Sequence, residues 1–384
     1  MLCSCLVFTL SSGCADKAAR VSLSPAPPTS EASVLRIAVL PMENLSGKEA
    51  PLADIRNAFI RSIAGQGVFV LSDDALDQFM TRHRMRYTGG LDSSTAQSIR
   101  TEERIDAVLI LSIELYQEGD IPKIALISRL VSTGDTPTIL WIKSVAIAGN
   151  DSPGLLRLGM IYDPVELRDK AIRILMASFE EYLSRKAAKQ GQEETGLRFG
   201  PKAAFRAPEA GQEKSYTIAV VPFFNTGMRK DSGDILLLHF VEELNRQGNF
   251  RVVEPGLVRN SMLNARVIMN EGISLADADF ILNTFNVDFV LSGKVIDYQD
   301  TISPDTPPSV DFLVWAIQRV TKKVFWASES YNAGNDAVFM FDFGKVTTAG
   351  KLASKMAAAV ARRIAGEQDQ LLPDLQVSPR QTAN

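Results

Sequence analysis

The sequence predicts an α/β chain of the α+β kind, in which one domain occurs twice and each copy is a mixed β-sheet backed by helices. Three observations predict it. Short sequence blocks return in the same order at a nearly constant spacing. Each copy alternates strand-like runs with helical periodicity and ends in a long helix. A length of 384 residues with 46% hydrophobic composition suits two globular domains joined by tethers.

The duplication is visible in four blocks, of which the last is a single tryptophan, and in one further residue. Residues 37–41 (IAVLP) return as 218–222 (IAVVP), and residues 67–71 correspond to 248–252, both 181 positions later. Asn44 corresponds to Asn225 at the same spacing. Residues 105–109 correspond to 287–291 after 182 positions, and Trp141 to Trp326 after 185. A run of four blocks in one order at almost constant spacing indicates two copies of one fold.

Each copy begins with a strand and a helix. An apolar run (35–40; 217–221) ends at a proline, as a buried strand does where it closes into a loop. The following helix places its apolar residues on one face and is expected to end at Gly67 or Gly248. These face residues are Leu52, Ile55, Phe59 and Ile63 in the first copy and Leu237, Phe240, Val241 and Leu244 in the second.

The rest of each copy is predicted as a short strand, shorter helices, three successive strands and a closing helix. The short strands are 68–71 and 250–253, and the first copy has helical segments around 74–80 and 95–103. The three strands are 107–116, 124–131 and 138–147 in the first copy, and 289–298, 310–320 and 323–331 in the second. The closing helices are 164–188, with Leu167, Ala171, Ile174, Leu175 and Tyr182 in phase, and 344–365, with Leu352, Met356, Val360 and Ile364.

These elements give the predicted organisation of the chain. The two domains are expected at 34–187 and 215–366, with a polar linker at 188–214 and a disordered tail at 367–384.

The N-terminus indicates export and lipid attachment. Residues 1–13 read as a signal peptide with an apolar run, and Leu10-Ser11-Ser12-Gly13-Cys14 resembles a bacterial lipobox, which implies acylation of Cys14. Residues 14–33, rich in Ala, Ser and Pro, are expected to form a flexible tether. Because no Lys or Arg precedes the apolar run, a translation start further upstream is expected. The alternative, an apolar cytosolic tail with an incidental cysteine, stays open.

Composition and motifs argue against catalysis. The only cysteines are Cys3, Cys5 and Cys14 and the only histidines His83 and His239, which excludes a disulfide network and cysteine-rich zinc sites. The net charge of −4 gives no field that attracts nucleic acid. Phosphate-loop, dinucleotide and nucleophile-elbow motifs are absent. We therefore expect no enzyme activity, cofactor, metal or nucleic-acid partner.

One surface segment is a candidate interaction patch: Arg82, His83, Arg84, Arg86 and Tyr87. Its charges suit an acidic partner, a phospholipid headgroup or lipopolysaccharide. A solvated loop is the alternative.

Other polar residues have structural interpretations. Asn44 and Asn225 are expected to hold turns, although a ligand contact beyond the strand end is the alternative. Asp106 and Asp288 are expected to cap or terminate helices, and Asp277 and Asp279 to lie at a helix start. Trp141 and Trp326 are expected to anchor their sheets.

The pattern I-A-V-L-P-x-x-N, then G-x-F-x-V, then a-D-a-V-L (a, apolar), then a tryptophan-marked strand resembles a group of bacterial envelope proteins. The group comprises the curli-secretion lipoproteins (CsgG type), the amino-terminal domain of TolB and the lipoprotein activators of penicillin-binding proteins. The resemblance covers residues 34–187 and 215–366. It implies a fold similar to anticodon-binding domains and a role in protein–protein contact or homo-oligomerisation.

Two functions follow from these expectations. The first is a non-catalytic adaptor or assembly module, anchored by Cys14 in the outer membrane, facing the periplasm and binding other envelope proteins. Ala15 after the cysteine favours the outer membrane by resemblance to enteric lipoprotein sorting. The alternative is an oligomeric subunit of a curli-type secretion or assembly apparatus. A pore is disfavoured because the candidate insertions 149–163 and 332–343 are too short for several spanning strands.

Overall fold

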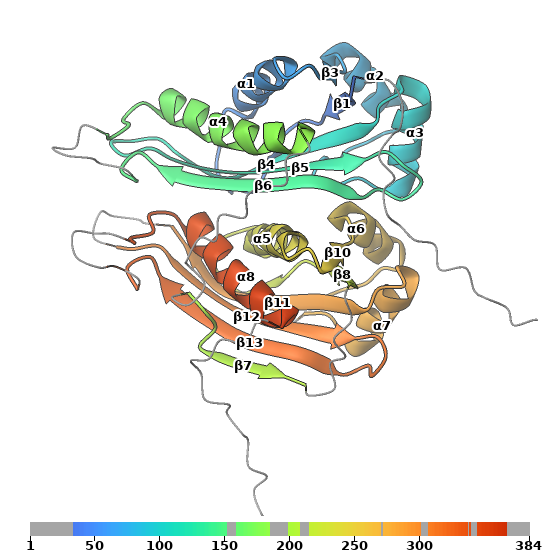
Figure 1. Ribbon diagram of the computed structural model, residues 1–384, viewed down its shortest axis with the longest axis vertical. Coiled ribbons are helices and arrows are strands. Elements are labelled where there is room, and N and C mark those ends of the chain that lie inside the picture. The colour runs from blue at the N-terminus through green and yellow to red at the C-terminus, as the bar shows by residue number, and fades with distance from the viewer. Residues whose placement is uncertain are drawn as a thin grey trace, which may run out of the picture. The chain divides into compact units, whose positions relative to one another are not determined.

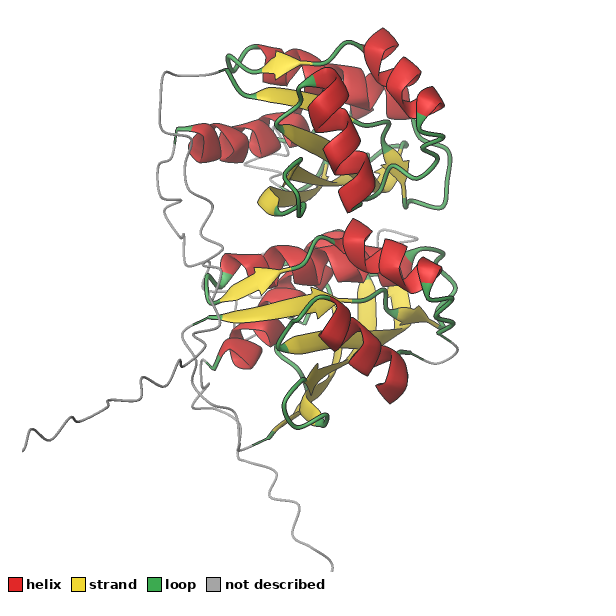
Figure 2. Cartoon of the chain, turned by 90° about the vertical axis from the view of Figure 1, so that its right-hand side faces the viewer, coloured by secondary structure: helices red, strands yellow, loops and turns green. Residues whose placement is uncertain are grey.

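The structure is a computed structural model that describes residues 34–151, 159–184, 199–207, 215–269, 272–300, 306–336, 338 and 344–366. Cys14, the tether, the tail, and large parts of the linker and of the two candidate insertions lie outside the described residues. No helix among the described residues is long and apolar enough to cross a membrane. Two mixed sheets, each with its own helices, form an α+β fold with two domain-like halves, which confirms the predicted fold class (Figures 1 and 2).

The first repeat holds a sheet of strand order β3-β1-β4-β5-β6, with β2 paired to β4. Strand β1 pairs in parallel with β3 and β4, and β2 pairs in parallel with β4. Strands β4, β5 and β6 form an antiparallel meander. Its elements are β1 (Arg36–Val39), β2 (Glu43–Asn44), α1 (Leu52–Ala64), β3 (Phe69–Val70), α2 (Asp73–Arg82), α3 (Ser93–Glu103), β4 (Ala107–Gln117), β5 (Lys123–Ser132), β6 (Ile139–Ala148) and α4 (Pro164–Leu183).

The second repeat has the same order with one added strand, β10-β8-β11-β12-β13-β7, and β9 paired to β11. Strand β7 comes from within the predicted linker, where no strand was predicted. The elements are β7 (Ala203–Arg206), β8 (Tyr216–Val220), β9 (Phe224–Asn225), α5 (Ser232–Arg246), β10 (Phe250–Val252), α6 (Pro255–Asn264), α7 (Leu275–Thr284), β11 (Phe289–Gln299), β12 (Ser309–Gln318), β13 (Val324–Ala333) and α8 (Ala349–Ala365).

The helices divide between the two faces of each sheet. In the first repeat, α1 and α4 pack on one face through residues such as Phe59, Leu175 and Phe179, while α2 and α3 cover part of the other. In the second repeat, α5 and α8 correspond to α1 and α4, and α6 and α7 to α2 and α3 (Figure 1). Trp141 and Trp326 are buried in these cores, which confirms the prediction.

The duplication extends to single hydrogen bonds. Asn44 accepts from the Ser46 amide and donates to the Lys48 carbonyl, and Asn225 accepts from the Gly227 amide and donates to the Arg229 carbonyl. The predicted turn role of both asparagines is thus confirmed. The β4–β5 and β11–β12 pairs also carry a bulge at the same place, Glu114 in one and Ile296 in the other.

Two local predictions were wrong in their physical detail. Asp106 and Asp288 do not cap helices: their carboxylates accept from the backbone amides of Arg36 and Thr217 at 2.9 and 2.8 Å, so they tie the start of the first strand to the sheet. In α4, Ile174 is 38% exposed and Ile172 takes the buried position.

The helix ends also differ from the expected positions. Helix α1 ends at Ala64, before Gly67, and α8 begins at Ala349, after Thr348 supplies its N-cap. Asp277 does lie in the first turn of α7, as expected.

Candidate functional site

The face of the first sheet that is turned away from α1 and α4 packs on helices of the second repeat. Ile127 of β5 and Ile142 of β6 belong to the same apolar core as α5 and α8, and Thr138 forms an isolated antiparallel bridge with Val253. The four layers therefore alternate in the order helices, sheet, helices, sheet (Figure 1).

This contact holds a buried ionic cluster around Glu114. The carboxylate lies 3.2 Å from His239 Nε2 on α5, and both side chains are 1% exposed. The hydroxyl of Tyr298 donates to the same carboxylate, and Arg229 donates to the Glu114 carbonyl and stacks 4.7 Å from the Tyr298 ring. Gly350 of α8 makes the room, because a Cβ there would lie 2.4 Å from Glu114 Oε1.

The partners in the cluster decide its charge state. Burial opposes ionisation of Glu114, but the hydrogen bond and charge of His239, with Arg229 and Tyr298, outweigh it and hold the pKa of this carboxyl below its usual range. Burial likewise opposes the charged form of His239, yet Glu114 outweighs it and raises the imidazole pKa. Both shifts favour the ionic form of the pair, a carboxylate beside an imidazolium, over its neutral form.

A second buried pair joins the repeats at the start of α6. Arg129 of β5 lies 3.2 Å from Glu254 and also donates to the Gly89 carbonyl. Glu254 accepts from the Leu91 amide at 3.4 Å and from the Gly256 amide at 3.3 Å. Only glycine fits at position 256, since a Cβ would lie 2.3 Å from the Leu91 nitrogen.

None of these interface residues was predicted from the sequence as part of a functional site. Glu114 and Arg129 stand in otherwise apolar strands, and a charge in such a run is the signal that marks a buried ionic contact. That signal gives the charge but not its partner, because His239 and Glu254 lie 125 positions further along the chain in each case.

The corresponding face of the second sheet is open. Among the described residues, no helix covers the β12–β13 side of that face, where Phe205 is 54%, Ile296 40% and Tyr331 53% exposed. We call this surface the open sheet face; its residues are Phe205, Ile296, Asp311, Leu313, Glu329 and Tyr331. It combines apolar side chains with two acids, as protein-binding surfaces do.

The predicted patch at 82–87 is divided by contacts within the chain. Arg82 pairs with Glu102 and Glu103 at 3.0 and 2.8 Å, and His83 lies 2.7 Å from Glu102. Tyr87 lies under Arg259, 4.0 Å from the guanidinium to the ring centroid. Arg84 and Arg86 are exposed. The interaction role of the patch stays a prediction, now centred on these two arginines.

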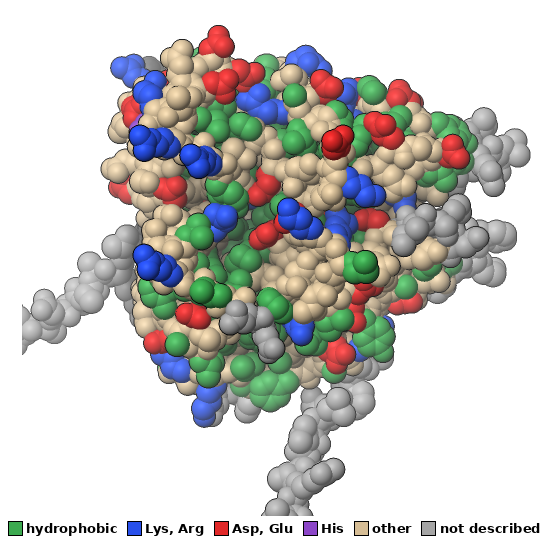
Figure 3. Space-filling view, turned by 180° about the vertical axis from the view of Figure 1, so that it is seen from behind, with side chains coloured by type: hydrophobic (Ala, Val, Ile, Leu, Met, Phe, Trp, Pro, Cys, Tyr) green, Lys and Arg blue, Asp and Glu red, His purple; other side chains and the backbone are tan. Residues whose placement is uncertain are grey.

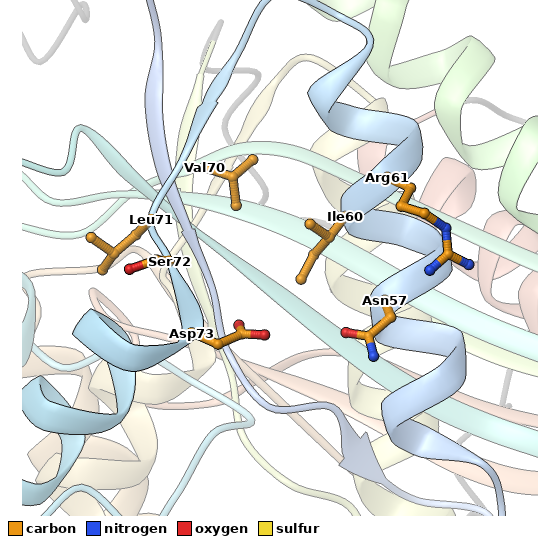
Figure 4. Close-up of a pocket in the computed structure, with 7 residues that line it drawn as sticks. All are labelled: Asn57, Ile60, Arg61, Val70, Leu71, Ser72 and Asp73. Atoms are coloured by element: carbon orange, nitrogen blue, oxygen red, sulfur yellow. The ribbon is translucent and has the colours of Figure 1, made fainter.

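A shallow pocket lies between α1 and the β3–α2 connection in the first repeat. Figure 4 shows Asn57 and Ile60 of α1 facing Val70 and Asp73 across it. Arg61, Leu71 and Ser72 complete its lining. Two of its polar groups have structural partners: the Ser72 hydroxyl accepts from the Ala75 amide at the start of α2, and Asp73 pairs with Arg56 at 2.7 Å.

The described residues contain no group of three or more His, Cys, Asp or Glu side chains that could hold a metal ion. On the face shown in Figure 3, basic and acidic side chains are interspersed. Such mixed charge favours specific local contacts over long-range attraction of one charged polymer.

Comparisons with known proteins give structural likeness only. No family model and no curated protein matches the chain. Similar solved structures include a PelC dodecamer from Paraburkholderia phytofirmans, 17% identical over 43% of this chain and 97% of that one, with a TM-score of 0.30. Lipoprotein GNA1162 from Neisseria meningitidis is 17% identical over 37% and 96%, with a TM-score of 0.28. The LpoB C-terminal domain from Salmonella enterica is 17% identical over 31% and 87%, with a TM-score of 0.25.

The fold and the site define the class of this protein as a tandem-repeat α+β chain with a buried ionic contact between its repeats and one open sheet face. At these identities and TM-scores the similar structures assign no family. The resemblance to curli-secretion and TolB domains stays a prediction.

Proposed function

We propose that this chain is a non-catalytic binding module of the bacterial cell envelope, anchored in the outer membrane through acylated Cys14 and presenting its repeats to other envelope proteins. The open sheet face is the observation that carries this proposal. The first repeat buries the corresponding face on α5 and α8, so the fold itself uses this surface for protein contact. The second repeat leaves it exposed with Phe205, Ile296 and Tyr331 at the surface.

The anchor and the surface serve one purpose together. Attachment at the N-terminus confines the chain to a membrane surface, and the lipobox-like segment before Cys14 supports such attachment. The open sheet face belongs to the second repeat, distant in sequence from that anchor. A chain of this organisation suits an adaptor that holds a partner near the membrane.

Mass spectrometry of the mature protein, combined with membrane fractionation, tests the anchor. We expect a mature chain that begins at acylated Cys14 and sediments with outer membranes, and a Cys14→Ser chain that does not. An unmodified Cys14 in the cytosolic fraction would overturn the localisation.

Site-specific photo-cross-linking in cells tests the binding surface. A cross-linker at position 331, on the open sheet face, is expected to capture a defined envelope protein, and Cys14→Ser should reduce that capture. Val320 is the matched control, because it is 84% exposed on the β12–β13 connection but lies outside the face. Equal capture from both positions, or none from position 331, would contradict the proposal.

A further inference from the structure

The contact between the repeats is head to tail. A sheet face of one repeat covers a helix face of the other, so the two surfaces in contact are different parts of one fold. Each repeat therefore owns one surface of each kind. The chain uses the sheet face of the first repeat and the helix face of the second. It leaves the open sheet face at one end and the outer side of α1 and α4 at the other.

We propose that a second copy of this chain docks through these two remaining surfaces, with the open sheet face of one molecule on the α1–α4 face of the next. The inference deepens the proposed function by naming one partner of the open sheet face. The contact within the chain is its template, because repeats of equal fold bring equivalent positions together.

Equivalent positions follow from the spacing of the repeats. Ile63 and Leu244 occupy the same place in α1 and α5, since each accepts from the amide three residues later. They are 181 positions apart (244 − 63), which makes Arg61 the equivalent of Glu242 (242 − 61 = 181). On the sheets, Trp141 and Trp326 are 185 apart, which makes Ser144 the equivalent of Glu329 (329 − 144 = 185).

The equivalent pairs are complementary in charge. Within the chain, Lys143, the neighbour of Ser144 on β6, lies with its Nζ 3.6 Å from the carboxylate of Glu242 on α5. At the proposed contact the same two places are held by Glu329 and by Arg61 of the next molecule, both of which are exposed in the single chain. A base on the sheet facing an acid on the helix is thus replaced by an acid on the sheet facing a base on the helix.

The centre of the contact is complementary in polarity. Within the chain the bulge residue Glu114 meets His239. The equivalent places are held by Ile296, the bulge residue of β11, and by Ala58 of α1 (239 − 58 = 181). Both partners change from charged to apolar together, so neither is left without a matching group.

The wider charge distribution favours the same pairing. Asp311 and Glu329 of the open sheet face lie beside Asp297 of β11, and burial and then the charges of Glu329 and Asp297 raise the pKa of Asp311. The helices α1 and α4 present the exposed bases Arg61 and Arg173 among exposed acids such as Glu166 and Glu180. Relief of the repulsion on the sheet therefore depends on Arg61 itself, which the pairing places at Glu329.

The proposed contact between molecules differs in one respect from the contact within the chain. Gly350 lets α8 approach the first sheet closely, whereas α4 has the exposed Val165 at the equivalent place (350 − 165 = 185). Wider spacing makes the contact between molecules weaker than the contact within one, so assembly depends on concentration. Head-to-tail contacts of this kind close into rings or extend as filaments.

Charge reversal tests the proposal in the purified full-length chain, held in detergent micelles and followed by sedimentation velocity across a concentration series. We expect concentration-dependent oligomers. Glu329→Arg alone and Arg61→Glu alone should each raise the assembly midpoint at least about tenfold. The double variant, which exchanges the two charges, should recover assembly. The matched controls Asp77→Arg on α2 and Arg100→Glu on α3 change exposed charges outside both surfaces and should leave the midpoint unchanged.

The outcomes distinguish head-to-tail assembly from other modes of assembly. Far-UV circular dichroism with a thermal melt shows that each variant is folded. A monomer at all concentrations overturns the proposal, as does a double variant no better than the single ones. Oligomers that respond to Glu329→Arg but not to Arg61→Glu show a symmetric sheet-to-sheet dimer, which also overturns it. Capture of another envelope protein from position 331 can still succeed in each of these cases, so the proposed function is tested independently.

Discussion

At the residue scale, the buried Glu114–His239 pair determines how the two repeats recognise each other. Two opposite charges in a dry contact are costly to bury and strongly attractive once paired, so the loss of one leaves the other without compensation. Both side chains are 1% exposed, which prevents water from replacing a missing partner. The pair thus mainly determines in which position the repeats dock, because a shifted arrangement would bury one of the two charges without its partner.

Removing the carboxylate charge tests this role. Glu114→Gln removes the charge that holds the proton on His239 and breaks the buried pair, and we expect the free energy of unfolding to fall by about 3–5 kcal/mol, as for other broken buried pairs. Urea unfolding followed by tryptophan fluorescence measures the change. Glu49→Gln, at an exposed site, is the control and should stay within about 0.5 kcal/mol of the natural chain. Equal effects of the two substitutions would show that the pair has no such role.

At the element scale, periodicity and punctuation predicted most of the helices and long strands. Local sequence determines these elements, because an apolar stripe needs one packed face and a proline or glycine ends a run. The short strands β2 and β9 were missed because two residues leave no pattern, although Asn44 and Asn225 within them were identified. Strand β7 was missed because its hydrogen-bond partner β13 lies more than 100 residues away.

The candidate site was less predictable than the fold. Glu114 and Arg129 were visible as charges in apolar strands, but their partners depend on how one repeat docks on the other. The segment 82–87 was visible by composition, yet Arg82 and His83 meet the acids of α3 for reasons of tertiary packing. Composition identifies a charge, and only the fold decides whether a partner within the chain already neutralises it.

The start of α6 gives a prediction for an element. Gly256→Ala places a methyl group 2.3 Å from the backbone nitrogen of Leu91, and a backbone atom cannot move aside as a flexible side chain can. We expect a loss of about 1–3 kcal/mol of stability and faster hydrogen exchange at the Leu91 amide. Gly134→Ala is the matched control, since its nearest atom would be 3.7 Å away. An unchanged exchange rate at Leu91 would contradict the close approach of the repeats.

At the scale of the whole molecule, ionisable groups near the repeat contact make stability depend on pH. Burial, followed by the charge of Glu242, raises the pKa of Glu243 to about 7, and desolvation with the charge of Glu43 raises that of the solvent-accessible Asp234 to about 6. The pKa of His239 is raised as well. In each case the folded chain holds a proton more tightly than the unfolded chain, so stability falls as pH rises through these values.

The pH profile follows from these signs. The contribution of His239 is fully present below its unfolded pKa of about 6.5 and is lost as pH rises through the higher folded value. Between about pH 4 and pH 7, Glu243 and Asp234 ionise in the unfolded chain before they ionise in the folded chain. The free energy of unfolding therefore falls as the pH rises through this range. Glu114 acts oppositely, because its lowered pKa adds stability that is lost only in strong acid. We expect a higher thermal midpoint at pH 5.5 than at pH 8.

Thermal melts in buffers from pH 5 to pH 8.5 measure this profile. Glu243→Gln should flatten the fall between about pH 5 and pH 7, where that carboxyl titrates. Asp77→Asn, at an exposed site on α2, should leave the slope unchanged. A midpoint that rises from pH 5.5 to pH 8 would show that these groups do not govern stability.

The pairing of β7 with β13 has a consequence for how the repeats separate. Helix α4 ends at Leu183 and β7 begins at Ala203 on the edge of the second sheet, so residues 184–202 alone connect the first repeat to that edge. A covalent connection keeps separated repeats at a high mutual effective concentration. In a variant whose contact is weakened, the two repeats therefore bind each other again far faster than either binds another molecule. Hydrogen exchange detects the brief opening, while the molecular mass stays the same.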